Sequence, residues 1–351
     1  MLGCTGWGPR SVVIDRGNYI DAIASSSKEQ IFNNLLRFRY GDVTAFVDLK
    51  QIVSGYTYGG SIGVNVLPDR INESAEVGGS LRYEGRPTLT YVPLTGRDFY
   101  ANILTPIPPE AIFSVLRAGW PVDLVLGTTV QKINGISAGI SIGRHKRPPD
   151  PRFWKIVELI EMLYADGILD FRISREQRAD KDENGQGQVV NSDTGKSLMW
   201  LEETTANAAA RNEIDDLKRL LGLDPDISEF ELIFGRLPGR ADQIVIMTHS
   251  IMTILGSFAD KAGIPQGHIA DGLAPASTPV DEMSHGLPFT IAWGSQAPAY
   301  AYVKTRYQDL WFWIANEDFP TKRTFSFLAL LFSLSAQGEG AQPPLLTIPA
   351  N

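Results

Sequence analysis

Apolar and polar residues alternate along two runs between positions 52 and 91, and a polar turn separates the runs. Successive side chains of a β-strand point to opposite faces, so each run predicts a strand with one apolar and one polar face. The two runs and their turn therefore predict a long amphipathic β-hairpin. Its apolar face carries Ile52, Tyr56, Tyr58, Ile62 and Val64 on the first strand, and Leu81, Tyr83, Leu89 and Tyr91 on the second.

This predicted hairpin has two interpretations. Each run is longer than the roughly 9–11 residues that a tilted strand needs to cross a bilayer, so hairpins from several copies could join into a closed sheet in a membrane. Alternatively, the apolar face covers the core of a water-soluble domain, because alternation is a weak signal for each membrane strand. The alternation is compatible with both interpretations.

The rest of the chain shows a mixture of helical and strand-like spacing. Helices are predicted over residues 18–39, 110–117, 122–133, 152–166, 207–221, 249–262 and 324–335. Strands are predicted over residues 168–174, 196–202, 230–234, 243–247, 300–307, 311–314 and 345–348. The order helix–strand–strand recurs after residue 152. The predicted fold class is therefore α+β, with an N-terminal helix, the long hairpin, and small C-terminal α/β modules.

A proline-rich stretch suggests where the chain divides. Residues 145–151 read HKRPPDP, and three prolines with a cluster of charges favour a linker over a helix or a central strand. This predicts an N-terminal tether over residues 1–17, an α+β domain over residues 18–144, and a second α+β domain over residues 152–351. Two domains agree with the length of 351 residues.

Charge and cysteine usage narrow the functional classes. A net charge of −8 argues against a nucleic-acid partner. The single cysteine excludes an intrachain disulfide and a cysteine-based metal cluster. No uninterrupted run of apolar residues is long enough for a transmembrane helix. No sequence pattern supports a nucleotide, haem or iron–sulfur cofactor.

The single cysteine, Cys4, directly follows Gly3 near the start of the chain. This step resembles the end of a bacterial lipoprotein signal, in which the cysteine becomes the first mature residue and carries lipid. Thr5 in place of aspartate then implies sorting to the outer membrane. The charged region and apolar stretch of a complete signal do not precede Cys4 in this sequence, so a free thiol is the alternative.

Several short motifs spread over nearly the whole chain support the same compartment. They are Arg39-Tyr-Gly-Asp42, Arg86-Pro-Thr-Leu-Thr-Tyr-Val-Pro-Leu94, Thr105-Pro-Ile-Pro-Pro-Glu110, Gly119-Trp-Pro-Val-Asp123, Val130-Gln-Lys-Ile-Asn-Gly135, Trp311-Phe-Trp-Ile314 and Lys322-Arg-Thr-Phe-Ser-Phe327. Together they resemble a family of bacterial outer-membrane lipoproteins with no established activity. The resemblance implies an envelope location and says nothing about chemistry.

One motif suggests catalysis. Gly135-Ile-Ser137-Ala-Gly139 has the spacing of a nucleophile elbow, in which small residues expose a serine between a strand and a helix. Asp242 and His249 would complete a serine, aspartate and histidine order along the chain. The helix predicted before Ser137 and the glycine- and proline-rich stretch after it argue against an elbow.

A second motif suggests a metal. Asp180, Asp182 and Asn184 precede Gly185 with the spacing of a calcium-binding loop, whose oxygen ligands converge on a hard cation. The twelfth position is Asn191, where such loops carry a bidentate glutamate. A charged loop without metal is the alternative, and calcium is the single candidate cofactor.

Two functional hypotheses follow. The first is a non-enzymatic lipoprotein of the outer membrane or periplasm, attached through Cys4 and the hairpin, that acts as an oligomeric scaffold or hairpin-lined pore. Its partners would be further copies of itself and other envelope proteins. The second is a soluble periplasmic serine hydrolase that uses Ser137, His249 and Asp242.

Overall fold

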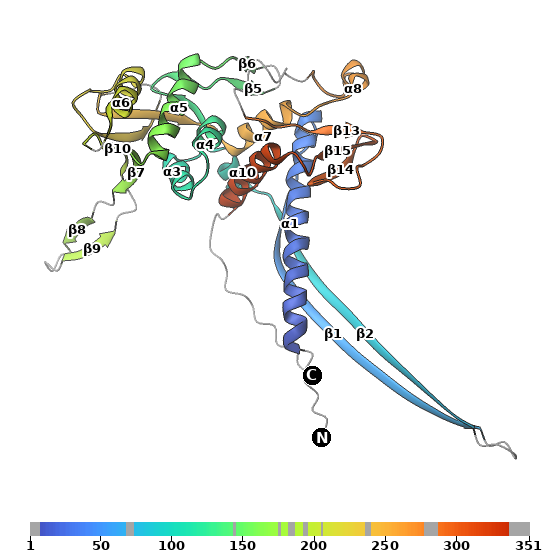
Figure 1. Cartoon of the computed structure of the whole chain (residues 1–351). Coiled ribbons are helices and arrows are strands. Elements are labelled where there is room, and N and C mark those ends of the chain that lie inside the picture. Colours follow the sequence, from blue (N-terminus) through green and yellow to red (C-terminus); the bar gives the residue numbers. More distant parts are fainter. Residues whose placement is uncertain are drawn as a thin grey trace. The chain divides into compact units, whose positions relative to one another are not determined.

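The computed structural model describes residues 8–67, 74–142, 145–174, 177–181, 187–191, 196–204, 206–235, 240–276 and 287–336. It confirms the α+β class, in which a long N-terminal helix is followed by a hairpin and then by helices and strands in mixed order (Figure 1). The chain divides into two compact units. The first comprises Met1–Thr44 with Arg97–Asn351, and the second is Ala45–Gly96.

The second unit is the predicted hairpin. Strands β1 (Phe46–Leu67) and β2 (Ser74–Leu94) pair antiparallel, so both extend beyond the predicted runs. The register shifts once, between Leu49 and Gln51, and is otherwise continuous along the described strands. A bulge of this kind inserts one residue into one strand and bends it locally.

A six-stranded sheet forms the centre of the first unit. Its order is β4-β3-β12-β11-β10-β7, and every pairing is antiparallel except that between β11 and β12. The strands are β3 (Val130–Ile133), β4 (Ile136–Ser137), β7 (Leu169–Ser174), β10 (Lys196–Leu201), β11 (Glu229–Phe234) and β12 (Gln243–Thr248). Strands from both sides of residues 145–151 join this sheet. The division of the chain therefore falls at Ala45 and Gly96, and not at the predicted linker.

Helices α3 (Pro109–Arg117), α4 (Val122–Thr129) and α5 (Pro151–Ala165) supply the apolar residues that pack on the sheet. Phe113 of α3 stacks on Phe171 of β7 with ring centroids 4.5 Å apart. Alternate residues of β10 are buried, as expected for a strand with one covered face. Helix α6 (Ala208–Leu221) packs against α5.

The remaining elements of this unit surround the C-terminal half of α1 (Gly8–Tyr40). They include α7 (Ile251–Asp260), α8 (Gln266–Ala270), α10 (Phe319–Ala336) and a three-stranded sheet of β13 (Ala292–Gly294), β15 (Leu310–Ile314) and β14 (Val303–Tyr307). Two small hairpins, β5 (Ile140–Ile142) with β6 (His145–Arg147) and β8 (Gln177–Lys181) with β9 (Gly187–Asn191), complete the described strands. None of the described helices combines the length and apolar character that a membrane span requires.

Local signals placed both ends of α3, α5 and α6 to within one residue, whereas α1 begins at Gly8, within the predicted tether. Asn207 accepts a hydrogen bond from the backbone N–H of Ala210 and begins α6, and Gly222 ends it with a φ of 68°. The helix predicted over residues 122–133 was wrong in its last turn, because Val130–Ile133 forms strand β3. Helix α2 (Arg97–Leu104) was not predicted. The predicted strand at residues 345–348 lies outside the described residues.

Candidate functional site

The register of β1 and β2 brings the two sequence alternations together. Ile52 is the direct partner of Leu89, Tyr58 of Tyr83, and Val64 of Val77. Directly opposed positions of an antiparallel pair share a face of the sheet. The apolar positions of both strands therefore belong to one face of the hairpin, as the sequence predicted.

Glycines occupy the register positions opposite several larger residues of this apolar face. Gly79 is the partner of Ile62, Gly60 of Leu81, and Gly85 of Tyr56. A glycine in a strand weakens it, because it loses more backbone entropy and supplies no side chain for packing. This hairpin therefore combines many β-branched and aromatic residues, which favour strands, with several glycines, which weaken them.

The opposite, polar face divides its charges unevenly between the two strands. Between the bulge and the turn, the charged positions of this face are Glu76, Arg82, Glu84 and Arg86, all on β2, whereas the charges of β1, Asp48 and Lys50, lie at or before the bulge. The partners of the four β2 residues are Asn65, Gly59, Thr57 and Gly55, which are small or uncharged. Each of these charged positions of β2 is thus paired with a position that carries no charge.

Both outer edges of the hairpin lack a strand partner among the described residues, since β1 and β2 form a sheet of two strands. The N–H and C=O groups along such edges are templates for pairing with another strand. An isolated two-stranded ribbon is at best marginally stable in water. The hairpin therefore has the backbone geometry of an element that gains stability from additional strands.

The motif Arg39-Tyr-Gly-Asp42 lies just before this hairpin in the chain and is held by specific contacts within the first unit. Arg39 donates from Nη2 to the carbonyl of Pro275 at 2.5 Å. The Tyr40 hydroxyl lies 2.8 Å from Nδ1 of His268 on α8, and Tyr307 of β14 donates to Asp42. Burial raises the pKa of Tyr40 to about 12, against the opposing effect of Arg39. These contacts fix the end of α1 against α8 and β14.

The structure places Ser137 in the two-residue strand β4. Strand β5 follows it and not the helix that a nucleophile elbow requires. Its Oγ accepts a hydrogen bond from the backbone N–H of Gly139 at 3.2 Å, which gives this side chain a local role in the turn.

The other two residues of the proposed hydrolase site lie apart from each other. Asp242 precedes β12 and His249 follows it, so the length of the strand, roughly 20 Å, separates them. Ser137 pairs with Lys132, and Lys132 pairs with Met247, which places the serine two strands away from β12. The structure therefore does not assemble the three residues. Burial lowers the pKa of His249 to about 4, which favours a neutral imidazole.

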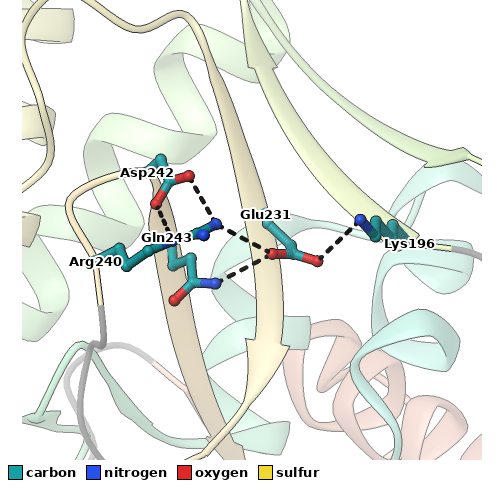
Figure 2. Close-up of polar contacts among 5 residues, drawn as sticks. All are labelled: Lys196, Glu231, Arg240, Asp242 and Gln243. Carbon is teal, nitrogen blue, oxygen red and sulfur yellow. Dashed lines mark hydrogen bonds and ion pairs between the residues drawn. The ribbon is translucent and has the colours of Figure 1, made fainter.

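Asp242 belongs instead to a network of polar side chains at the start of β12 (Figure 2). Nε and Nη2 of Arg240 each donate to one carboxylate oxygen of Asp242, both at 2.8 Å. Glu231 of β11 accepts a hydrogen bond from Gln243 at 3.1 Å and lies 4.0 Å from Lys196. Exposed ion pairs of this kind contribute little stability.

The predicted calcium loop lies only partly within the described residues. Asp180 lies in β8 and is the register partner of Gln188 in β9. Asp182 and Asn184 lie outside the described residues, as does Cys4, the predicted lipid attachment site. Within the described ranges, no group of three or more histidine, cysteine, aspartate or glutamate side chains is arranged to hold a metal ion.

The first unit contains an apolar groove that sequence analysis did not identify. It has a volume of about 420 Å³, within the range of small-molecule sites. Its walls come from the last turn of α2, the α2–α3 connection, α3, α4, the start of α7 and the last turns of α10. Their residues are Asn102, Thr105, Pro106, Ile107, Pro108, Ala111, Ile112, Val115, Val125, Thr129, Ile251, Phe327, Leu331 and Leu334. Most of these residues lie in helices that the sequence predicted, but helical spacing could not show where neighbouring helices leave a gap.

Comparisons of the chain with protein-family models, with curated proteins and with solved structures gave no match.

Proposed function

We propose that this chain is a non-enzymatic lipoprotein of the bacterial cell envelope that assembles through its β1–β2 hairpin into a pore or scaffold at the outer membrane. One observation carries the proposal: the register unites the apolar positions of two long strands on one face, while both outer edges have no strand partner among the described residues. The resemblance to bacterial lipoproteins and the Gly3-Cys4 step support the compartment.

Backbone hydrogen bonding explains why several copies are needed. In lipid, each unpaired N–H or C=O group costs several kcal/mol, so a lone hairpin with two open edges cannot remain there. A ring of hairpins pairs every edge with its neighbour. Tyr56, Tyr58, Tyr83 and Tyr91 would then supply the aromatic residues that gather at membrane interfaces, and the polar positions would line water.

The alternative interpretation of the hairpin as the cover of a soluble core makes the opposite prediction for accessibility. Single cysteines at Ile62 and Ser61 lie on adjacent positions and opposite faces of β1, so they form a matched pair. In native membranes we expect Ile62→Cys to react with lipid-phase probes and Ser61→Cys with aqueous probes. The unmutated chain serves as the control, because any labelling of it comes from the native Cys4. Equal aqueous labelling of both variants would contradict the membrane proposal.

Two further measurements test the rest of the proposal. Electron microscopy of the protein extracted in mild detergent should show rings, and a uniform population of monomers would contradict assembly. Mass spectrometry of the mature N-terminus from native cells should find a lipid-modified Cys4. An unmodified Cys4 in the membrane-free fraction would remove the anchor from the proposal.

A further inference from the structure

The groove described above is lined along two turns of α10 and about one turn of α3. Phe327, Leu331 and Leu334 follow one another on one side of α10, and Ala111 and Val115 do so on α3. From Phe327 to Leu334 the helix rises by about 10 Å. The groove is therefore extended along its helices, and its walls are formed by aliphatic and aromatic side chains.

The chemistry of the lining disfavours a charged group inside the groove. Among the described residues, none that lines the groove carries a charge. The hydroxyl of Thr129, in its wall, already donates to the carbonyl of Val125 at 2.7 Å. The polar side chains of Asn102 and Thr105 belong to exposed residues at the rim. A buried charge or an unpaired peptide group would lose its hydration here without a new partner. The interior thus suits hydrocarbon, and the rim suits a polar end.

We infer that this groove binds one linear acyl chain of a lipid, with the polar head of that lipid at the rim beside Asn102 and Thr105. The extended shape, the volume and the uncharged lining all fit a single alkyl chain. A peptide fits less well, because it would bring backbone N–H and C=O groups into a lining that offers them few partners. The inference depends on the groove in the first unit, so it stands or falls independently of the hairpin pore.

The dependence of binding affinity on the length of the alkyl chain tests this inference. The full-length protein is titrated with sodium alkanoates and with the corresponding 1-alkanols, from hexyl to hexadecyl, below their aggregation concentrations. Each added methylene should tighten binding about fourfold while the groove fills, and the affinity should then reach a plateau. Alkanoates and alkanols of equal length should bind similarly, with one ligand per chain. The inference would be overturned if affinity did not change with chain length, or if the alkanoates bound and the alkanols did not.

Two exposed leucines provide a matched pair of variants. Leu334 lines the groove and is 49% exposed, whereas Leu104 is 57% exposed and is not part of the lining. Because both side chains reach solvent, replacement by glutamine should leave the fold intact. Leu334→Gln should weaken binding of the longer alkanols at least fivefold, and Leu104→Gln should leave it unchanged. Equal effects of the two substitutions would place the bound chain elsewhere, for example on the hairpin.

Other occupants of the groove would give different results, and each would overturn the inference. Binding that appears only after residues 337–351 are removed would mean that the C-terminal segment of the chain fills the groove. A change of oligomeric state with Leu334→Gln and not with Leu104→Gln, measured by light scattering, would mean that a second copy covers it.

Discussion

Asn134 and Val245 are joined by two hydrogen bonds, although Asn134 lies in the turn directly after β3 and Val245 lies in the middle of β12. The backbone N–H of Asn134 donates to the carbonyl of Val245 at 2.9 Å, and the N–H of Val245 donates to Oδ1 of Asn134 at 2.7 Å. Nδ2 of Asn134 also donates to the carbonyl of Leu221 at 2.6 Å. Beyond the end of β3, Asn134 thereby supplies the two hydrogen bonds that a further strand residue would make with Val245. Its third bond attaches the end of α6 to the same turn.

Two substitutions at Asn134 separate the contribution of its side-chain hydrogen bonds from that of its backbone conformation. It has a φ of 44°, a region that glycine adopts without strain and alanine does not. Asn134→Gly should lower the free energy of unfolding by roughly 2–4 kcal/mol, because it removes two hydrogen bonds and leaves the Val245 N–H buried without a partner. Asn134→Ala should cost about 1 kcal/mol more. Denaturant titration measures both. A glycine variant as stable as the parent would show that these bonds contribute nothing.

Gly256 determines how closely α7 approaches α1. A Cβ at this position would lie 2.8 Å from Cε1 of Phe38, so either the half-buried Phe38 ring or the helices must shift. Gly256→Ala should therefore destabilise the protein by roughly 1–3 kcal/mol, despite the gain of about 1 kcal/mol in helix propensity. Gly267→Ala is the matched control, since a Cβ at Gly267 meets no atom within 4 Å. If both substitutions raise the thermal unfolding temperature, the contact between Gly256 and Phe38 leaves room for a methyl group and the prediction is wrong.

His249 should make stability depend on pH. Burial lowers its pKa from 6.5 to about 4 in the folded chain. Between these two values the unfolded chain binds a proton and the folded chain does not, so stability falls as the pH is lowered from about 6.5 to about 4 and this loss ends below that range. The full effect is roughly 3 kcal/mol, at about 1.4 kcal/mol per pH unit. His249→Gln should remove this component. Parallel stability curves for the parent and the variant would contradict the assignment.

Ser137 should be dispensable. Its position in β4, and its separation from Asp242 and His249 by the geometry of the sheet, leave neither of these two residues in a position to activate it as a general base. Ser137→Ala should therefore leave the cellular phenotype unchanged, with a small effect on the Gly139 turn. Loss of the phenotype at normal abundance and normal thermal stability would revive the hydrolase hypothesis.

The sequence predicted elements best where local chemistry decides the outcome. The hairpin, α5, α6 and the strands β7 and β10 follow from alternation, helical spacing and capping residues. The prediction for Val130–Ile133 was wrong, because a short apolar run after a helix looks the same whether it continues the helix or pairs with β12. That choice is made by a strand more than a hundred residues later.

Candidate sites were harder to predict, because motifs record spacing along the chain and not separation in space. Ser137, Asp242 and His249 have the right order, and the sheet nevertheless holds them apart. The groove shows the reverse case. Ala111, Val125 and Leu331 are unremarkable core-type residues in sequence, and only the packing of three helices makes them the walls of one groove. No local sequence pattern shows which residues of separate helices will meet in the folded chain.

The proposed closed sheet makes a prediction about deletions in the hairpin. Gly59 and Gly60 pair with Arg82 and Leu81, so removing all four residues shortens both strands equally and preserves every remaining pair and face. Removing Gly60 alone shifts the end of β1 by one residue and exchanges its apolar and polar faces. In membranes we expect the four-residue deletion to retain oligomers in cross-linking and electron microscopy, and the single deletion to lose them. Thermal unfolding of the first unit should be unchanged in both, because it has its own core. If the single deletion assembles as well as the four-residue deletion, the register of the hairpin does not direct assembly.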